Sequence, residues 1–132
     1  MEPRLSFVTL GVTDLERSIR FYEKVLGLPR LETPDSVAFF EMGKTWLALF
    51  PREELAADAG ISPVGTGFPG FTLAHNVRSE AQVDRLLSEV AEGGGTIVRP
   101  GRRADWGGYT GYFSDPDGFL WEVAWNPGFP HV

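Results

Sequence analysis

The sequence carries the same pattern of predicted elements twice, and this repeat limits the folds that the chain can adopt. Each copy opens with a strand pattern, over 5–12 and over 70–77, that leads into an amphipathic helix pattern. We expect the two helices to begin at Thr13 and Ser79, which lie 66 residues apart in a chain of 132. We infer a tandem duplication of a β-α-β-β-β module of about 60 residues.

In the first copy, Thr13 and Glu16 have the spacing of a capping box. They predict a helix over 15–26 with one apolar stripe, which glycine and proline then end. Two strand patterns follow, over 37–42 and 45–50, and the Gly-Lys pair between them predicts a hairpin.

In the second copy, Ser79 and Gln82 form another capping box, and three consecutive glycines at 93–95 end the predicted helix. A D-P-D-G sequence at 115–118 has proline and glycine where a tight turn prefers them. The other elements that we expect are a short strand, a loop and the two strands of a final hairpin, over 96–99, 101–108, 109–114 and 119–125.

These patterns predict an α+β fold in which two tandem β-α-β-β-β modules pair into an open, curved mixed sheet around a central cavity. One module alone has too small a core to be stable, so we expect a single domain over residues 1–132. Its expected parts are module one, a linker with a short helix, module two and a C-terminal tail, over about 4–52, 53–69, 70–126 and 127–132.

Composition excludes several classes of site. The chain has no cysteine and only two histidines, His75 and His131, so thiolate metal sites and three-histidine sites are impossible. The net charge is −6 and no run of Lys or Arg is present, which argues against a nucleic-acid partner. No apolar run is long enough to cross a membrane and the start does not resemble a signal peptide, so we expect a cytoplasmic protein.

Two segments resemble a known family. Residues Phe7–Gly27, F-V-T-L-G-V-T-D-L-E-R-S-I-R-F-Y-E-K-V-L-G, resemble the first module of the vicinal oxygen chelate superfamily, also called the glyoxalase/bleomycin resistance protein/dioxygenase family. Residues Asp115–Val123, D-P-D-G-F-L-W-E-V, resemble its closing hairpin. The resemblance implies the duplicated fold, a small-molecule site and a homodimer, but the family's activities are diverse.

The resemblance also locates the family's four metal-ligand positions, which fall at Phe7, Ala48, Thr72 and Glu122. Tight binding of a divalent metal needs several charged or imidazole ligands. Of the residues at these four positions, only Glu122 has such a side chain. We therefore predict that the metal site is degenerate, with no metal ligands and no cofactor. Strand alternation places His75 on the face away from Thr72.

Alternation from the same positions predicts a mainly apolar ligand pocket with a few polar points. The loop before the final hairpin adds two aromatic residues, which we expect at the pocket rim on a mobile flap. Turn chemistry alone would also explain the glycines of that loop, and large aromatic side chains could fill the core and leave no cavity. The predicted ligand-binding residues are Phe7, Trp46, Ala48, Phe50, Thr72, Asn76, Trp106, Tyr109 and Glu122.

Glu122 is the candidate catalytic residue, because an apolar cleft favours the protonated form of a carboxylate. It could act as a general base or as the anionic partner of a cationic ligand. The leading hypothesis is a protein that binds a small apolar or aromatic molecule without metal. The alternatives are a metal-dependent lyase, isomerase or dioxygenase, and a metal-free enzyme with Glu122 as general base, so the sequence leaves open whether the chain is an enzyme.

Overall fold

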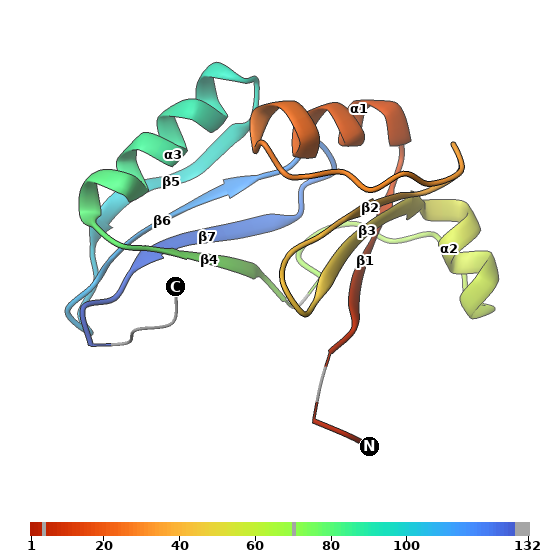
Figure 1. Cartoon of the computed structure of the whole chain (residues 1–132), viewed down its shortest axis with the longest axis horizontal. Helices are drawn as coiled ribbons and strands as arrows, with labels where there is room; N and C mark the ends of the chain where they lie inside the picture. Colours follow the sequence, from red (N-terminus) through yellow and green to blue (C-terminus); the bar gives the residue numbers. More distant parts are fainter. Residues whose placement is uncertain (4, 70, 129–132) are drawn as a thin grey trace. The chain divides into compact units, whose positions relative to one another are not determined.

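The structure is a computed structural model that describes residues 1–3, 5–69 and 71–128. It divides into two compact units, residues 1–67 and 68–132, each of which combines a β-sheet with helices (Figure 1). The fold is α+β, as predicted, and neither sheet closes into a barrel within the described residues.

The first unit contains a three-stranded sheet. Its elements in chain order are β1 (Phe7–Val12), α1 (Leu15–Arg20), the π-helix η1 (Phe21–Val25), β2 (Ala38–Phe40), β3 (Trp46–Pro51) and α2 (Arg52–Ala59). The strand order is β1-β3-β2, with β1 parallel and β2 antiparallel to β3. The predicted hairpin of 37–42 and 45–50 is therefore confirmed, with a shorter first strand.

The N-cap of the first helix lies one residue later than the capping box predicted. Asp14, not Thr13, is the N-cap, and its carboxylate accepts a hydrogen bond from the Arg17 backbone N–H at 3.0 Å. The Thr13 hydroxyl instead accepts a hydrogen bond from the Arg17 guanidinium at 3.1 Å. The helix also widens after Arg20 into η1, so the single helix predicted over 15–26 has two parts.

One face of this sheet forms the core of the first unit. Leu10 and Leu49 are almost completely buried on that face, and the Tyr22 ring of η1 lies 6.0 Å from the Phe40 ring, centre to centre. Burial of each such side chain stabilises the fold by about 1.5–3 kcal/mol. The helical segment 15–25 therefore covers this face, and the opposite face of the same strands is left to other contacts.

A short backbone pairing continues the sheet beyond β2. Arg30 forms an isolated antiparallel bridge with Phe40, and the Leu31 N–H donates to the Phe39 carbonyl at 2.9 Å. The fourth strand position of the predicted module is thus occupied by a few residues around Arg30 rather than by a full strand.

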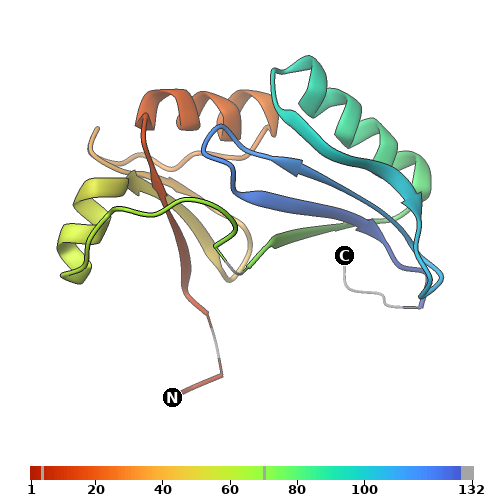
Figure 2. The same cartoon turned by 180° about the vertical axis from the view of Figure 1, so that it is seen from behind.

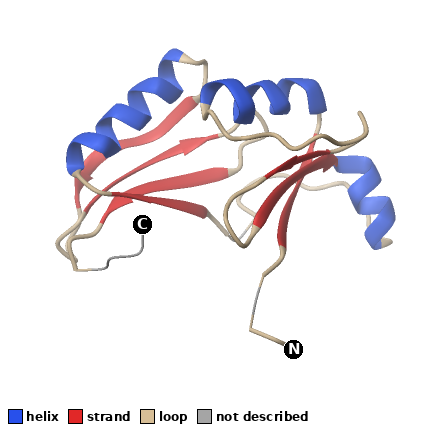
Figure 3. Cartoon of the chain, in the orientation of Figure 1, coloured by secondary structure: helices blue, strands red, loops and turns tan. Residues whose placement is uncertain are grey.

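The second unit contains a four-stranded sheet covered on one face by α3 (Figure 3). Its elements are β4 (Leu73–Val77), α3 (Glu80–Glu92), β5 (Thr96–Arg103), β6 (Tyr109–Ser114) and β7 (Leu120–Trp125). The order is β4-β7-β6-β5, with β4 parallel to β7 and the other pairs antiparallel. If the pairing at Arg30 is counted as a fourth strand beside β2, the strands of the first unit follow the same order as those of the second. The tandem duplication itself stays a prediction.

The Ser79 cap of α3 is confirmed, and the reciprocal bond of the predicted capping box reaches Arg78, one residue before the cap. The Ser79 hydroxyl accepts from the Gln82 backbone N–H at 3.2 Å, and the Gln82 side chain accepts from the Arg78 N–H at 2.8 Å. The D-P-D-G turn is confirmed as well, because the Gly118 N–H donates to the Asp115 carbonyl at 3.0 Å.

Strand β5 is longer than predicted and is irregular. It extends over Thr96–Arg103, whereas the sequence suggested a strand over 96–99 and a loop from 101. Its pairing with β6 shifts register between Ile97 and Arg99 and again before Arg102. Proline and glycine at 100–101 suggested the start of a loop, but both residues also occur at bulges of strands, as here.

Replacement of Ser79 by alanine should destabilise the protein, because α3 would lose the acceptor for the Gln82 N–H. We expect the free energy of unfolding to fall by about 1 kcal/mol. Chemical denaturation measures this change. Ser88→Ala is the matched control, since Ser88 is exposed within the same helix and alanine is the better helix former there. Equal losses in the two variants would contradict the assigned cap.

Candidate functional site

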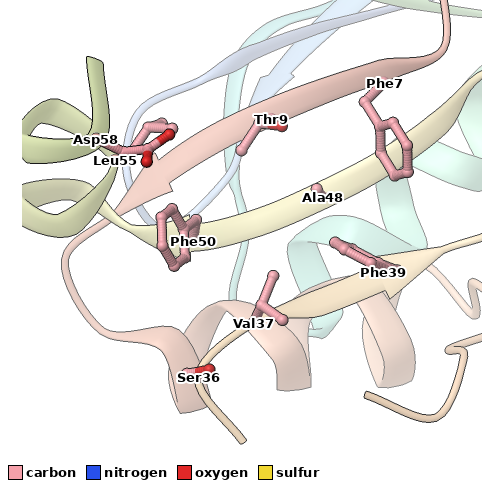
Figure 4. Close-up of a pocket in the computed structure, with 9 residues that line it drawn as sticks. All are labelled: Phe7, Thr9, Ser36, Val37, Phe39, Ala48, Phe50, Leu55 and Asp58. Atoms are coloured by element: carbon pink, nitrogen blue, oxygen red, sulfur yellow. The ribbon is translucent and has the colours of Figure 1, made fainter. Parts of the chain in front are cut away.

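The first unit has an open pocket on the sheet face that the helical segment 15–25 leaves uncovered. Its volume is about 410 Å³. Figure 4 shows its side chains around one space: Phe7, Thr9, Ser36, Val37, Phe39, Ala48, Phe50, Leu55 and Asp58.

Strand register explains the floor of the pocket. Thr9, Ala48 and Phe39 are direct cross-strand neighbours on β1, β3 and β2, so their side chains share one face. Phe7 and Phe50 lie on the same face, two residues along their strands. The floor is therefore small in the middle, at Thr9 and Ala48, and aromatic around it.

Helix α2 closes one end of the pocket with Leu55 and Asp58 (Figure 4). It packs against β1 and β3, as the view from behind also shows (Figure 2). A Cβ atom on Gly11 would lie 3.3 Å from both the Arg52 Cα and the Leu55 Cδ2 atoms. Gly11 thus allows the helix to approach the strand closely enough to form this end wall.

An aromatic cluster of Phe7, Phe39 and Trp46 forms the other end. The Phe7 ring centre lies 5.3 Å from that of Phe39 and 5.7 Å from that of Trp46. These tilted and edge-on contacts hold the Phe7 ring, although 42% of that residue remains exposed. Trp46 does not line the pocket but supports the two phenylalanines that do.

The pocket is mostly apolar, with few polar groups. Thr9 and Ser36 contribute hydroxyls, and Asp58 is the charged member of the lining residues. The pocket therefore favours apolar or aromatic ligand surface, with polar groups at its margins.

Three of the predicted site residues, Phe7, Ala48 and Phe50, line this pocket. The alternative that aromatic side chains fill all the space does not hold for it. Sequence reasoning missed Phe39, although it lies on a predicted strand and is opposite Ala48. It missed Val37 as well, two residues from Phe39 on the same predicted strand. Ser36, Leu55 and Asp58 were also missed, because no strand periodicity relates a loop or a helix to the sheet.

Glu122 lies in the second unit, on the sheet face away from α3. Ala74 and Tyr112 are its direct neighbours on β4 and β6. The Thr110 hydroxyl donates a hydrogen bond to Glu122 Oε1 at 2.9 Å, and the Tyr112 hydroxyl also donates to Glu122. Two hydroxyl donors therefore hold the carboxylate of the candidate catalytic residue.

Tyr112 lies between a negative and a positive group. Burial raises its pKa, and the charge of Glu122 and their hydrogen bond raise it further. The Arg99 guanidinium, whose central carbon is 4.7 Å from the ring centre, acts in the opposite direction. Tyr112 is consequently held as a neutral phenol, which keeps its proton.

The other predicted residues of β4 separate by face. Asn76 pairs with Ala124, two residues from Glu122 on β7, and so shares the Glu122 face. His75 pairs with Val123 and lies on the α3 side, as alternation predicts; burial lowers its pKa. Thr72 is exposed and precedes β4.

Trp106 and Tyr109 do not join Glu122. The β5–β6 loop is a short turn, in which the Ala104 N–H donates to the Gly108 carbonyl at 2.9 Å. Gly107 has a positive φ of 94°, and the Trp106 ring occupies the space that a Cβ on Gly108 would need. Turn chemistry thus explains both glycines.

Tyr109 faces α3 rather than Glu122. Its hydroxyl donates to Asp84 Oδ1 at 2.9 Å, and this hydrogen bond is the main cause of its raised pKa. The two rim residues of the predicted site are therefore engaged in local contacts of the second unit.

The predicted metal-ligand positions can be compared with the side chains of the described residues. Phe7 and Ala48 offer no donor atom, and no three His, Asp or Glu side chains gather around a possible ion in the described part of the chain. His131 lies outside the described residues. No helix in the same described ranges is long and apolar enough to cross a membrane.

The chain is similar to several known proteins. It is 36% identical to a glyoxalase-related enzyme from Fulvimarina pelagi, whose crystal structure matches with a TM-score of 0.90 over 97% of this chain and 91% of that one. It is 30% identical to the metallothiol transferase FosB of Shouchella clausii, over 90% of this chain and 77% of the relative.

A second curated relative is longer. The lactoylglutathione lyase of Arabidopsis thaliana is 30% identical over 91% of this chain, but the chain spans only 43% of that protein. The model of the Glyoxalase/Bleomycin resistance protein/Dioxygenase superfamily matches residues 4–123, nearly the whole described chain. The fold, the sheet order and this match together show that the chain belongs to the Glyoxalase/Bleomycin resistance protein/Dioxygenase superfamily.

Proposed function

We propose that this protein binds a small apolar or aromatic molecule in the pocket of its first unit. The pocket carries the proposal, because three phenylalanines, Phe7, Phe39 and Phe50, surround an open volume of about 410 Å³. Small-molecule sites span roughly 300–1,000 Å³ and are lined mainly by apolar and aromatic side chains.

Binding in this pocket requires no metal. Phe7 and Ala48 occupy two of the four positions at which the family resemblance expects ligands, and both line the apolar pocket. Affinity there comes from the removal of apolar surface from water, which needs no charged centre.

Enzymatic activity is the second candidate. The names of two relatives, a metallothiol transferase and a lactoylglutathione lyase, favour it. So does Glu122, whose carboxylate is held by the Thr110 and Tyr112 hydroxyls in a position where it could accept a proton. In this version Glu122 is the general base of a metal-free reaction.

The assembly and location belong to the same proposal. The family resemblance favours a homodimer in the cytoplasm, with a small molecule as its ligand. Light scattering on the purified chain tests the dimer directly: a mass of about 14.6 kDa, that of one chain, would contradict it.

Replacement of Thr9 by phenylalanine should block the pocket. Thr9 is exposed at the centre of the floor, so a larger side chain enters empty space rather than the core. We expect affinity for the neutral dye N-phenyl-1-naphthylamine to fall about tenfold or more, while the fold persists. Dye fluorescence and quenching of Trp46 measure binding, and circular dichroism monitors folding.

Thr96→Phe provides the matched control for Thr9→Phe. Thr96 is also an exposed strand threonine, but it belongs to β5 of the second unit and is not among the residues that line the pocket. The control should bind the dye like the unmodified protein. Equal dye affinity in all three proteins would refute the assigned pocket.

Divalent metal should bind weakly. A single carboxylate at Glu122 with neutral neighbours lacks the ligand charge of a tight site. We expect elemental analysis of protein purified without chelator to find far less than one equivalent of transition metal per chain. One equivalent that disappears in Glu122→Gln would instead support the metal-dependent alternative.

Glu122→Gln should leave dye affinity unchanged, because Glu122 does not line the pocket. The same variant separates binding from catalysis. Loss of a measured turnover with normal dye binding would support the enzyme candidate, whereas loss of dye binding would contradict the pocket as the primary site.

A further inference from the structure

A bulge in β5 of the second unit determines which face of the sheet carries Arg99. The register shift between Ile97 and Arg99 is a bulge in β5. Ile97 pairs with Phe113, whereas Arg99 pairs with Tyr112, the next residue along β6, so the two side chains lie on opposite faces. Without this bulge, simple alternation would give Arg99 the same face as Ile97.

The bulge thus places Arg99 on the sheet face away from α3. Gly111, one residue from Tyr112, defines the other face, because its Cβ would lie 2.5 Å from Leu87 of α3. Arg99 and Glu122 are the two neighbours of Tyr112 in one cross-strand row. This row combines a cation, an aromatic ring and a carboxylate.

Stacking holds the guanidinium of Arg99 in place. Its central carbon lies 4.7 Å from the centre of the Tyr112 ring, within the range of a cation–π contact. A planar guanidinium held in this way has lost much of its rotamer freedom before any ligand arrives, which favours binding by its hydrogen-bond donors.

Arg99 nevertheless lacks an acceptor. Its Nε atom is buried and makes no hydrogen bond, and no carboxylate among the described residues forms an ion pair with it. The obvious candidate, Glu122, already accepts hydrogen bonds from Thr110 and Tyr112. Buried donors on charged groups are normally paired, because leaving one unpaired is destabilising.

We propose that Arg99 is an oxyanion-binding residue, which pairs with a carboxylate or phosphate group of a small molecule on the face of β6 and β7 that carries Glu122. Arginine matches such groups because its donors form a planar fork. Tyr112 is the platform that positions the guanidinium. All the residues named for this site belong to the second unit.

The Nε–H resonance of Arg99 provides a direct test by NMR on the full chain. Benzoate and inorganic phosphate, each titrated at constant ionic strength against sodium chloride, serve as the carboxylate and phosphate probes. We expect a saturable shift of this resonance with at least one probe, and a saturable shift with either supports the site. Absence of a saturable shift with both probes would overturn the proposal.

Two conservative variants separate the site from general surface charge. Arg99→Lys keeps the charge but loses the fork, and should weaken binding of the active probe, followed by backbone amide shifts, about tenfold. Arg103→Lys is the matched control, since Arg103 is exposed on the same strand and pairs with Tyr109, on the α3 side of the sheet; its effect should stay below about twofold. Equal losses in both variants, or full affinity in Arg99→Lys, would also overturn the proposal.

Thr9→Phe distinguishes this inference from the proposed function. The variant changes the first unit and leaves Arg99 intact. Absence of dye binding in the unmodified chain would overturn the proposed function and leave the oxyanion result standing on its own, whereas absence of a saturable Arg99 shift would overturn this inference and leave dye binding standing.

Discussion

The two-residue period of a β-strand determines which side chains of each sheet face away from its covering helix. In each unit a helical segment covers one face of the sheet, and the side chains of that face form the core. They include Leu10 and Leu49 in the first unit and Val123 in the second. The opposite face is then composed of the alternate residues of the same strands. In the first unit these are large aromatic side chains and small residues, and the difference in their size leaves the pocket.

Much of this arrangement follows from the sequence alone. Alternation along 5–12 and 45–50 places Phe7, Ala48 and Phe50 on one face, and the structure assembles them around one pocket. The α3 cap and the D-P-D-G turn were equally predictable, because each uses short-range hydrogen bonds between residues at fixed spacing. Such features depend on local geometry and need no knowledge of distant contacts.

Other features could not be predicted from the sequence pattern, because they depend on tertiary contacts or on irregularities in a strand. Asp14 and Thr13 are both good capping residues, and only the hydrogen bond to Arg17 distinguishes them. One end of the pocket comes from α2, and Ser36 comes from a loop, and the approach of both to the sheet is a matter of tertiary packing. A bulge changes the parity of a strand, so Arg99 lies on the opposite face from the one that counting residues predicts.

The two uncovered faces have different chemistry, although their strands follow the same order. In the proposed function, the first face gains affinity by burial of apolar surface, which is strong but weakly directional. The second places charged and hydroxyl groups of Arg99, Tyr112 and Glu122 in one row, which gives direction and charge selectivity. The pocket of the first unit has few polar groups, at Thr9, Ser36 and Asp58, whereas every member of the row in the second unit is polar or charged. On the two proposals made above, the pocket selects mainly by apolar surface and size, and the row by charge.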